Sequence, residues 1–91
     1  MAISRTSFVE LNSAFRFQWE EAQDCYVLLF PEGMVQLNET AGEILKHCER
    51  AIMVDALISR LEQEFPDADE LADDVLEFLQ DAYEQQWLKL S

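Results

Sequence analysis

The sequence predicts an α+β fold, in which a three-stranded antiparallel meander precedes three helices in a winged-helix-like arrangement. Short segments before residue 38 have the alternating or continuous apolar character of strands, and the rest of the chain has apolar residues at helical spacing. The length of 91 residues and the hydrophobic fraction of 49% favour one core. We therefore expect a single domain over residues 1–91, with an extended or poorly ordered start at 1–12.

Three strands are expected in the first part of the chain. Residues 15–19 alternate apolar and polar side chains, and residues 25–30 form a continuous apolar run that is typical of a strand covered on both faces. Pro31 supplies a fixed φ and Gly33 a positive φ for a tight turn. A third short strand follows at 34–37.

The first helix is expected to begin at Asn38 or Thr40, since either residue can cap it and Thr40 with Glu43 has the spacing of a capping box. Gly42 inside this helix costs about 1 kcal/mol relative to alanine. Either the backbone packs closely against a neighbouring element there, or the glycine is simply tolerated.

The second and third helices follow from apolar spacing. The second is predicted from Val54 to a stop near Phe65, because Pro66 disfavours helical geometry at the residue before it. Asp67 is the expected N-cap of the third helix, with Glu70 three residues further on. The apolar stripe of this helix consists of Leu71, Val75, Phe78, Leu79, Ala82 and Tyr83.

Composition limits the possible partners. Nineteen acidic and six basic residues give a net charge of −13, which repels phosphate backbones and anionic lipids. The third helix, from Ala68 to Gln86, contains no lysine or arginine with which to read DNA. The start of the chain does not have the pattern of a signal peptide, so we expect a cytoplasmic protein without nucleic-acid or membrane partners.

No constellation in the sequence predicts catalysis, a metal or a cofactor. The single histidine, His47, is interpreted as a partly exposed helix residue, and Cys25 and Cys48 as reduced, mainly structural thiols. A cluster of carboxylates precedes the second strand and is interpreted as a solvated hairpin turn rather than a cation site. Its members are Glu20, Glu21 and Asp24.

The strand at 34–37 is the last of the meander and is expected to expose unpaired backbone groups that can accept an added peptide strand. About five hydrogen bonds of roughly 0.5 to 1.5 kcal/mol fall short of the about 8 kcal/mol that micromolar binding requires, so apolar pockets must contribute. The stripe of the third helix can form such a wall, although a stripe of this kind is more often core. Val35→Pro is expected to weaken binding more than stability.

The residues from Phe30 to Asn38, FPEGMVQLN, followed by Ala41, Ile44 and Leu45, resemble the signature of the PqqD family, a Pro-Glu-Gly turn that leads to Leu-Asn and a helix. The resemblance extends over residues 4–90. It implies a peptide chaperone of pyrroloquinoline quinone biosynthesis, which captures the ribosomal precursor peptide and delivers it to a radical S-adenosylmethionine enzyme without chemistry of its own.

The same resemblance implies where the peptide lies. It would add a strand along one edge and contact one face of the third helix. The edge comprises Met34, Val35, Gln36 and Leu37, and the opposite wall comprises Val75, Phe78, Leu79 and Ala82.

Three departures from the family pattern lead to further hypotheses. The family usually has glycine and then threonine between helices one and two, where this chain has Arg50 and Met53. We hypothesise that the two helices run together and exchange elements in a homodimer. Gln86 stands where the family more often has glycine, and a short extra strand is hypothesised at 87–90.

Two other classes of function remain open at this point. One is an acidic structural or regulatory module that binds a basic protein partner. The other is an enzyme with Asp or Glu as acid or base, for which the sequence offers carboxylates but no metal motif or nucleophile arrangement.

Overall fold

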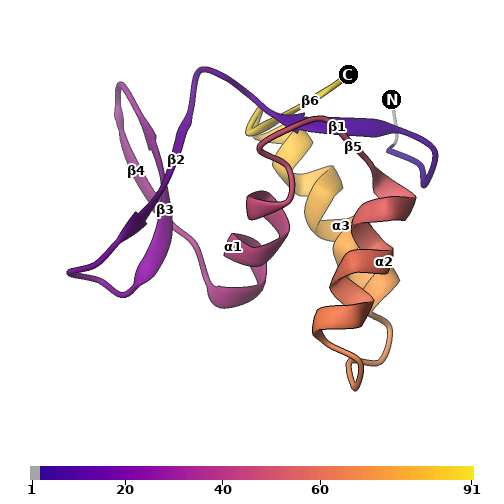
Figure 1. Ribbon diagram of the computed structural model, residues 1–91. Coiled ribbons are helices and arrows are strands. Elements are labelled where there is room, and N and C mark those ends of the chain that lie inside the picture. The colour runs from indigo at the N-terminus through magenta and orange to yellow at the C-terminus, as the bar shows by residue number, and fades with distance from the viewer. Residues whose placement is uncertain (1–2) are drawn as a thin grey trace.

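The computed structural model describes residues 3–91, which form two three-stranded antiparallel sheets and three helices (Figure 1). The elements are β1 (Phe8–Leu11), β2 (Arg16–Glu20), β3 (Cys25–Phe30), β4 (Gly33–Gln36), α1 (Glu39–Lys46), β5 (Ile52–Met53), α2 (Val54–Glu64), α3 (Leu71–Glu84) and β6 (Leu88–Leu90). The α+β class, the meander and the three helices are confirmed, whereas the winged-helix-like arrangement stays a prediction. Residues 1–2 of the expected extended start lie outside the described residues.

The predicted meander is the sheet β2-β3-β4. Its inner face aligns Phe17, Leu28 and Val35 across the three strands. Val27 and Leu28 are both fully buried in β3, which agrees with the continuous apolar run that predicts this strand.

The turn between β3 and β4 differs from the expectation in its backbone. Phe30 pairs with Gly33, so Pro31 and Glu32 form the loop. No glycine has a positive φ, and Gly33 is instead the first residue of β4. The prediction of a positive φ at Gly33 was therefore wrong. The fixed φ of Pro31 is enough to start the turn without a residue of positive φ.

A second sheet, β5-β1-β6, was not predicted from the sequence. Its central residue, Val9, is fully buried and lies opposite Ile52 on one side and Leu90 on the other. The segment expected only to be extended or poorly ordered therefore contains a paired strand. The short tail strand hypothesised at 87–90 is confirmed as β6.

Helix α1 begins at its predicted cap. The Asn38 Oδ1 atom accepts a hydrogen bond from the Ala41 backbone N–H at 2.8 Å, which decides between the two candidate caps. An alanine Cβ at Gly42 would lie 2.9 Å from Cδ2 of Tyr26. The glycine therefore allows the close packing of α1 against β3, and this was one of its two expected roles.

Helices α1 and α2 are separate, so the hypothesis of one continuous helix was wrong. Helix α1 ends at Lys46, and β5 lies between the two helices. The N-terminus of α2 has no side-chain cap, but the N–H groups of Val54 and Asp55 donate to the carbonyls of Ser7 and Arg5. Backbone groups of the N-terminal segment thus replace the missing cap, and the exchange of elements in a homodimer loses its basis.

The boundaries of α2 and α3 test the remaining helix predictions. Helix α2 ends with Phe65 as C-cap, directly before Pro66, as predicted. Asp67 is not the N-cap of α3, because that helix begins at Leu71 after Glu70, which has a left-handed backbone at φ 58 and makes no capping hydrogen bond. Capping spacing alone predicted this start three residues too early, since the residues before Leu71 form turns instead.

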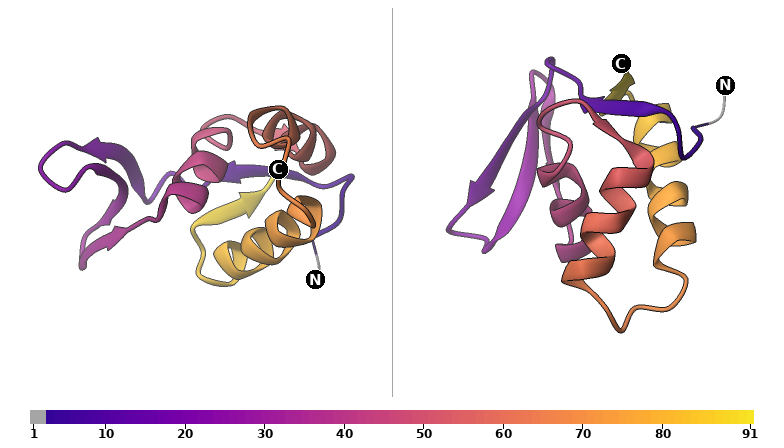
Figure 2. Two further views of the ribbon diagram at one scale, coloured as in Figure 1. Left: turned by 90° about the horizontal axis from the view of Figure 1, so that it is seen from below. Right: turned by 45° about the vertical axis from the view of Figure 1, so that its right-hand side comes forward.

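The helices share one core with both sheets. Helix α1 packs against β3, and α2 packs against α3. Figures 1 and 2 show α1 between the sheet β2-β3-β4 and the pair of α2 and α3. Among the described residues, no helix has the length and apolar character required to cross a membrane.

Candidate functional site

The outer edge of β4 follows from the hydrogen-bond phase of its pairing with β3. The Leu37 N–H donates to the Tyr26 carbonyl at 3.0 Å. Hydrogen-bonded and non-hydrogen-bonded pairs alternate along an antiparallel ladder. The pair of Val35 and Leu28, two residues along, is therefore hydrogen-bonded, and the backbone groups of Val35 point into the sheet.

Met34 and Gln36 are the residues of β4 whose backbone N–H and C=O groups point away from β3. Each lies in a non-hydrogen-bonded pair, opposite Leu29 and Val27. Among residues 3–91 no strand pairs with this side of β4, and both side chains are exposed. Proline at Val35 would consequently break the ladder to β3, so the premise of the Val35→Pro expectation, that this N–H lies on the free edge, was wrong.

The residues predicted for the helix wall are mostly buried in the core. Val75, Leu79 and Ala82 have no exposed surface, and Phe78 is half-buried. Helix α3 packs against α2 and β6, while α1 is the helix that packs against the sheet of β4. The structure therefore places Met34, Val35 and Gln36 at an open edge, Leu37 in the core at its end, and the buried helix residues elsewhere in the core.

A pocket of about 340 Å³ lies between the end of this sheet and the start of α1. It reaches Leu37, the residue directly after β4, and it is adjacent to Glu39 and Glu43 of the helix. Antiparallel pairing brings the start of β3 to the same end of the sheet, so Trp19, Tyr26 and Asp24 line the pocket as well.

Aromatic packing fixes the wall of this pocket. The Tyr26 ring stacks on Phe17 with centroids 4.7 Å apart, and Trp19 meets Tyr26 edge-on at 5.0 Å. Gly42 contacts the other side of Tyr26. This pocket was not predicted from the sequence. The alternation of β2 and the aromatic residue in β3 indicate it only once the register of the two strands is known.

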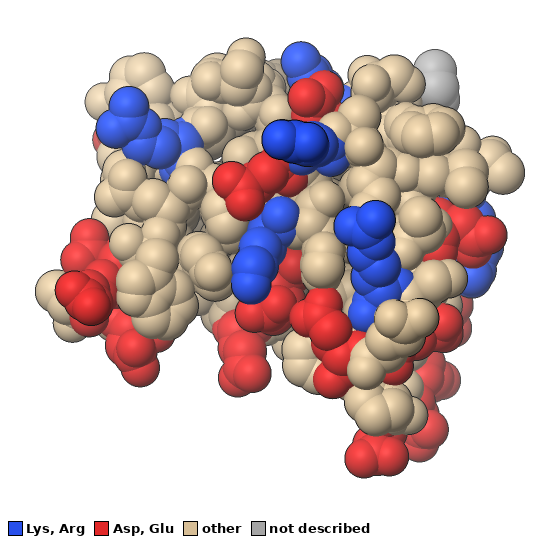
Figure 3. All heavy atoms as spheres, viewed as in Figure 1, with Lys and Arg blue, Asp and Glu red and all other residues tan. Residues whose placement is uncertain are grey.

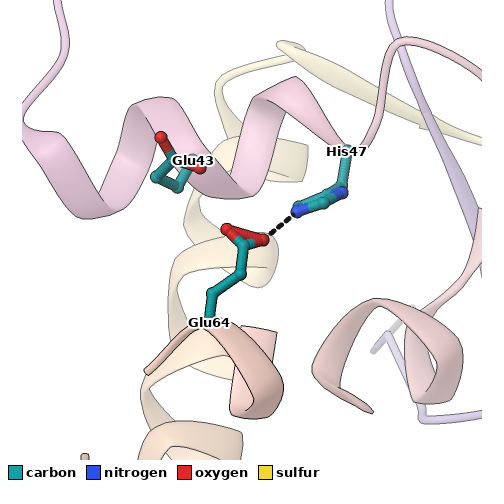
Figure 4. Close-up of side chains that lie close together, drawn as sticks. All are labelled: Glu43, His47 and Glu64. Carbon is teal, nitrogen blue, oxygen red and sulfur yellow. Dashed lines mark hydrogen bonds and ion pairs between the residues drawn. The ribbon is translucent and has the colours of Figure 1, made fainter. Parts of the chain in front are cut away.

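His47 has a more specific environment than the sequence indicates. It is the C-cap of α1, and its Nε2 atom lies 2.6 Å from Oε1 of Glu64 at the end of α2. Figure 4 shows Glu43 beside this pair, and the potential ligand atoms of the three residues lie within 4.8 Å of one another. Donors of these types can hold a divalent cation. The contact between His47 and Glu64, however, already accounts for their proximity, because it joins the ends of α1 and α2.

The two thiols are free and differ in burial. Cys48 is fully buried, and burial raises its pKa to about 12. Cys25 is half-buried in β3 and lies at the pocket. The burial of Cys48 agrees with the structural role expected for it, and both thiols are free, as expected for reduced cysteines.

Charge is unevenly distributed on the surface. In Figure 3 acidic side chains gather along the lower part of the displayed face, where the hairpin turn of β2 and β3, the start of α1 and the loop between α2 and α3 lie. Among residues 3–91 the ion pairs are Arg5 with Asp55, His47 with Glu64 and Lys89 with Glu10. Within the described part of the chain, none of the carboxylates at the pocket forms an ion pair.

The chain matches the family model described as Coenzyme PQQ synthesis protein D (PqqD) over residues 25–88, which is more than half of its length. The chain belongs to the PqqD family. A PqqA binding protein of Azotobacter vinelandii is 47% identical over 81 residues, 89% of this chain and 88% of that protein. A PqqA binding protein of Pseudomonas paraeruginosa is 49% identical over 80 residues, 88% of this chain and 87% of that protein.

A solved structure of the PqqD family also resembles this fold. It is the solution NMR structure of the PqqD truncation of Methylobacterium extorquens PqqCD, described as a functional and stand-alone recognition element for ribosomally synthesized and post-translationally modified peptides. The TM-score is 0.78 at 27% identity, covering 97% of this chain and 95% of that chain. The family resemblance drawn from the turn of β3 and β4 is thus confirmed.

Proposed function

We propose that this member of the PqqD family is a non-catalytic, cytoplasmic peptide chaperone. It binds the ribosomal precursor peptide of pyrroloquinoline quinone by strand addition and presents it to the radical S-adenosylmethionine enzyme of the pathway. The observation that carries the proposal is the open edge of β4, where Met34 and Gln36 direct unpaired backbone groups outward. Relatives named PqqA binding proteins support the same kind of ligand.

Backbone pairing alone does not account for useful affinity. Met34 and Gln36 offer four outward backbone groups, and hydrogen bonds of about 0.5 to 1.5 kcal/mol each yield roughly 2 to 6 kcal/mol. Micromolar binding requires a net free energy of about 8 kcal/mol, and the contacts must also offset the conformational freedom that the peptide loses on binding. Side-chain contacts beside the edge must supply the rest.

The β4 edge itself offers side-chain contacts, and α3 would add others only if the peptide reached beyond that edge. The exposed Met34 and the half-buried Val35 belong to opposite faces of β4, so an added strand can contact both. The half-buried ring of Phe78 is the most accessible of the four predicted helix residues. Val75, Leu79 and Ala82 would join the site only if α3 shifted on binding.

An NMR titration tests where the peptide binds. Isotope-labelled protein is titrated with the precursor peptide, with a scrambled peptide of the same composition as control. We expect amide shifts concentrated at Met34, Gln36 and Leu37, since these residues lie at the free edge or at its end. Absence of shifts at high micromolar peptide, or equal shifts with the scrambled peptide, would refute strand addition at β4.

The absence of catalysis has its own test. The protein and the precursor peptide are incubated together and the peptide mass is followed, with and without the radical S-adenosylmethionine enzyme. We expect an unchanged peptide mass with this protein alone, because among residues 3–91 the side-chain hydrogen bonds join serine and threonine hydroxyls to one another and His47 to Glu64, not a nucleophile to a base. A mass change without the enzyme would contradict the non-catalytic role.

A further inference from the structure

The pocket beside β4 lies where a bound strand would leave the sheet. Its lining includes Leu37, which directly follows the last outward-facing edge residue, Gln36. A peptide strand that pairs with Gln36 would therefore place a side chain one or two residues further along near the pocket mouth. The volume of about 340 Å³ is large enough for one long side chain.

The rim of this pocket is negatively charged. Asp24, Glu39 and Glu43 border it, and none of them belongs to an ion pair among residues 3–91. Glu43 also lies within 4.8 Å of His47 and Glu64, so Asp24 and Glu39 are the carboxylates that face the pocket without such neighbours. The start of α1 has the opposite effect, but a helix terminus is equivalent to only about half a positive charge. Three carboxylates on a chain of net charge −13 outweigh that contribution, so the pocket attracts cations.

The wall of the pocket is aromatic. Trp19 is 48% exposed, and it packs edge-on against Tyr26 at an interplanar angle of 77°. Tyr26 cannot readily move, because Phe17 stacks on it and Gly42 packs against it. A tryptophan ring that stays exposed beside carboxylates can receive a cationic group through cation–π attraction and the apolar stem that carries it.

We infer that this pocket binds a lysine or arginine side chain of the captured peptide, an inference that rests on the proposed peptide-binding function. The aromatic wall contacts the methylene stem, and the carboxylates of Glu39 and Glu43 pair with the cationic end. An aliphatic side chain would leave the carboxylates without a partner, and an acidic one would be repelled. The pocket thus adds side-chain specificity to an edge that otherwise recognises only backbone.

The test is a double-mutant cycle measured by isothermal titration calorimetry. One partner is the wild-type protein or the variant Glu39→Gln with Glu43→Gln, which keeps the side-chain shape and removes the charge. The other partner is the precursor peptide, with each lysine replaced in turn by norleucine and each arginine by citrulline. The variant Glu62→Gln with Glu77→Gln, on the exposed faces of α2 and α3, controls for the change in net charge.

We expect one basic residue of the peptide whose replacement weakens binding to the wild-type protein about tenfold, with little further loss in the pocket variant. The control variant should bind as the wild type does. Equal affinities for every replaced peptide, or full affinity of the pocket variant, would overturn the pocket inference while leaving strand addition intact. If the unmodified peptide does not bind the wild-type protein, the proposed function fails and this inference fails with it.

Discussion

The two sheets of this protein are built from different parts of the chain and serve different purposes. The sheet β2-β3-β4 uses consecutive strands joined by short turns, and β4 keeps one side unpaired. The sheet β5-β1-β6 joins the start, the middle and the end of the chain, and its central strand β1 is paired on both sides. The second sheet therefore stabilises the fold by joining distant segments of the chain, whereas the first sheet leaves an edge that a ligand can pair with.

The largest expected difference between the sheets is in stability. Leu88 in β6 is 2% exposed, and Leu88→Ala should lower the free energy of unfolding by about 2 to 5 kcal/mol through the cavity it leaves. Met34 in β4 is 42% exposed, and Met34→Ala should change stability by less than about 0.5 kcal/mol. Urea unfolding followed by circular dichroism measures both. Similar losses would contradict the division of roles.

The buried thiol of Cys48 allows the stability of the fold around the sheet β5-β1-β6 to be tested by pH. The Cys48 carbonyl accepts the Leu11 N–H of β1 at 2.8 Å, so the residue lies directly beside this sheet. Burial raises the pKa of Cys48 from 9.0 to about 12, so the folded protein keeps a proton that the unfolded chain releases. The contribution of the protonated Cys48 thiol to the free energy of unfolding is complete below pH 9 and is lost as the pH rises toward 12. Between pH 9 and 10.5 we expect a loss of about 2 kcal/mol.

The matched variants Cys48→Ala and Cys25→Ala separate this effect from other titrations in the alkaline range. Cys48→Ala should remove the additional slope of unfolding free energy against pH, and Cys25→Ala should keep it. Parallel profiles for the wild type and Cys48→Ala would show that the thiol does not carry the pH dependence.

The smallest expected effect concerns the turn that leads into β6. Gln86 has a positive φ of 66, a conformation that glycine adopts without the steric cost of a Cβ atom. Gln86→Gly should raise the free energy of unfolding by about 0.5 kcal/mol, because the relief of strain slightly exceeds the added freedom of the unfolded chain. Gln85→Gly, at a right-handed position, should lower it instead. Destabilisation by both would contradict this account of the turn.

The difference between the sheets also explains what sequence patterns could predict. Strands β2, β3 and β4 were predicted because their alternation and their turn are local features. Strand β5 has only two residues, too few for a periodic signal, and β1 is not joined to either of its partners by a hairpin turn. Both strands depend on pairing with segments far along the chain. Gln86 and the tail strand β6 were reached only through comparison with a family pattern.

The candidate site was predictable in part for the same reason. That β4 is a terminal strand followed from the order of the meander, but which of its residues face outward required the register and one hydrogen bond, between Leu37 and Tyr26. The stripe on α3 could not be assigned to core or groove by spacing, and the structure buries Val75, Leu79 and Ala82. The pocket beside Trp19 depends on how α1 docks on β3, which no local pattern encodes.

The measurement that tests strand addition most directly is the peptide affinity of Gln36→Pro, compared with Gln36→Ala. Proline at this edge position removes an outward N–H without breaking the ladder to β3, and alanine removes the same side chain while keeping the N–H. By calorimetry we predict that Gln36→Pro remains folded and binds the precursor peptide at least about tenfold more weakly, through a lost hydrogen bond and a blocked edge, whereas Gln36→Ala binds nearly as the wild type does. Wild-type affinity in a folded Gln36→Pro variant would contradict peptide pairing with β4.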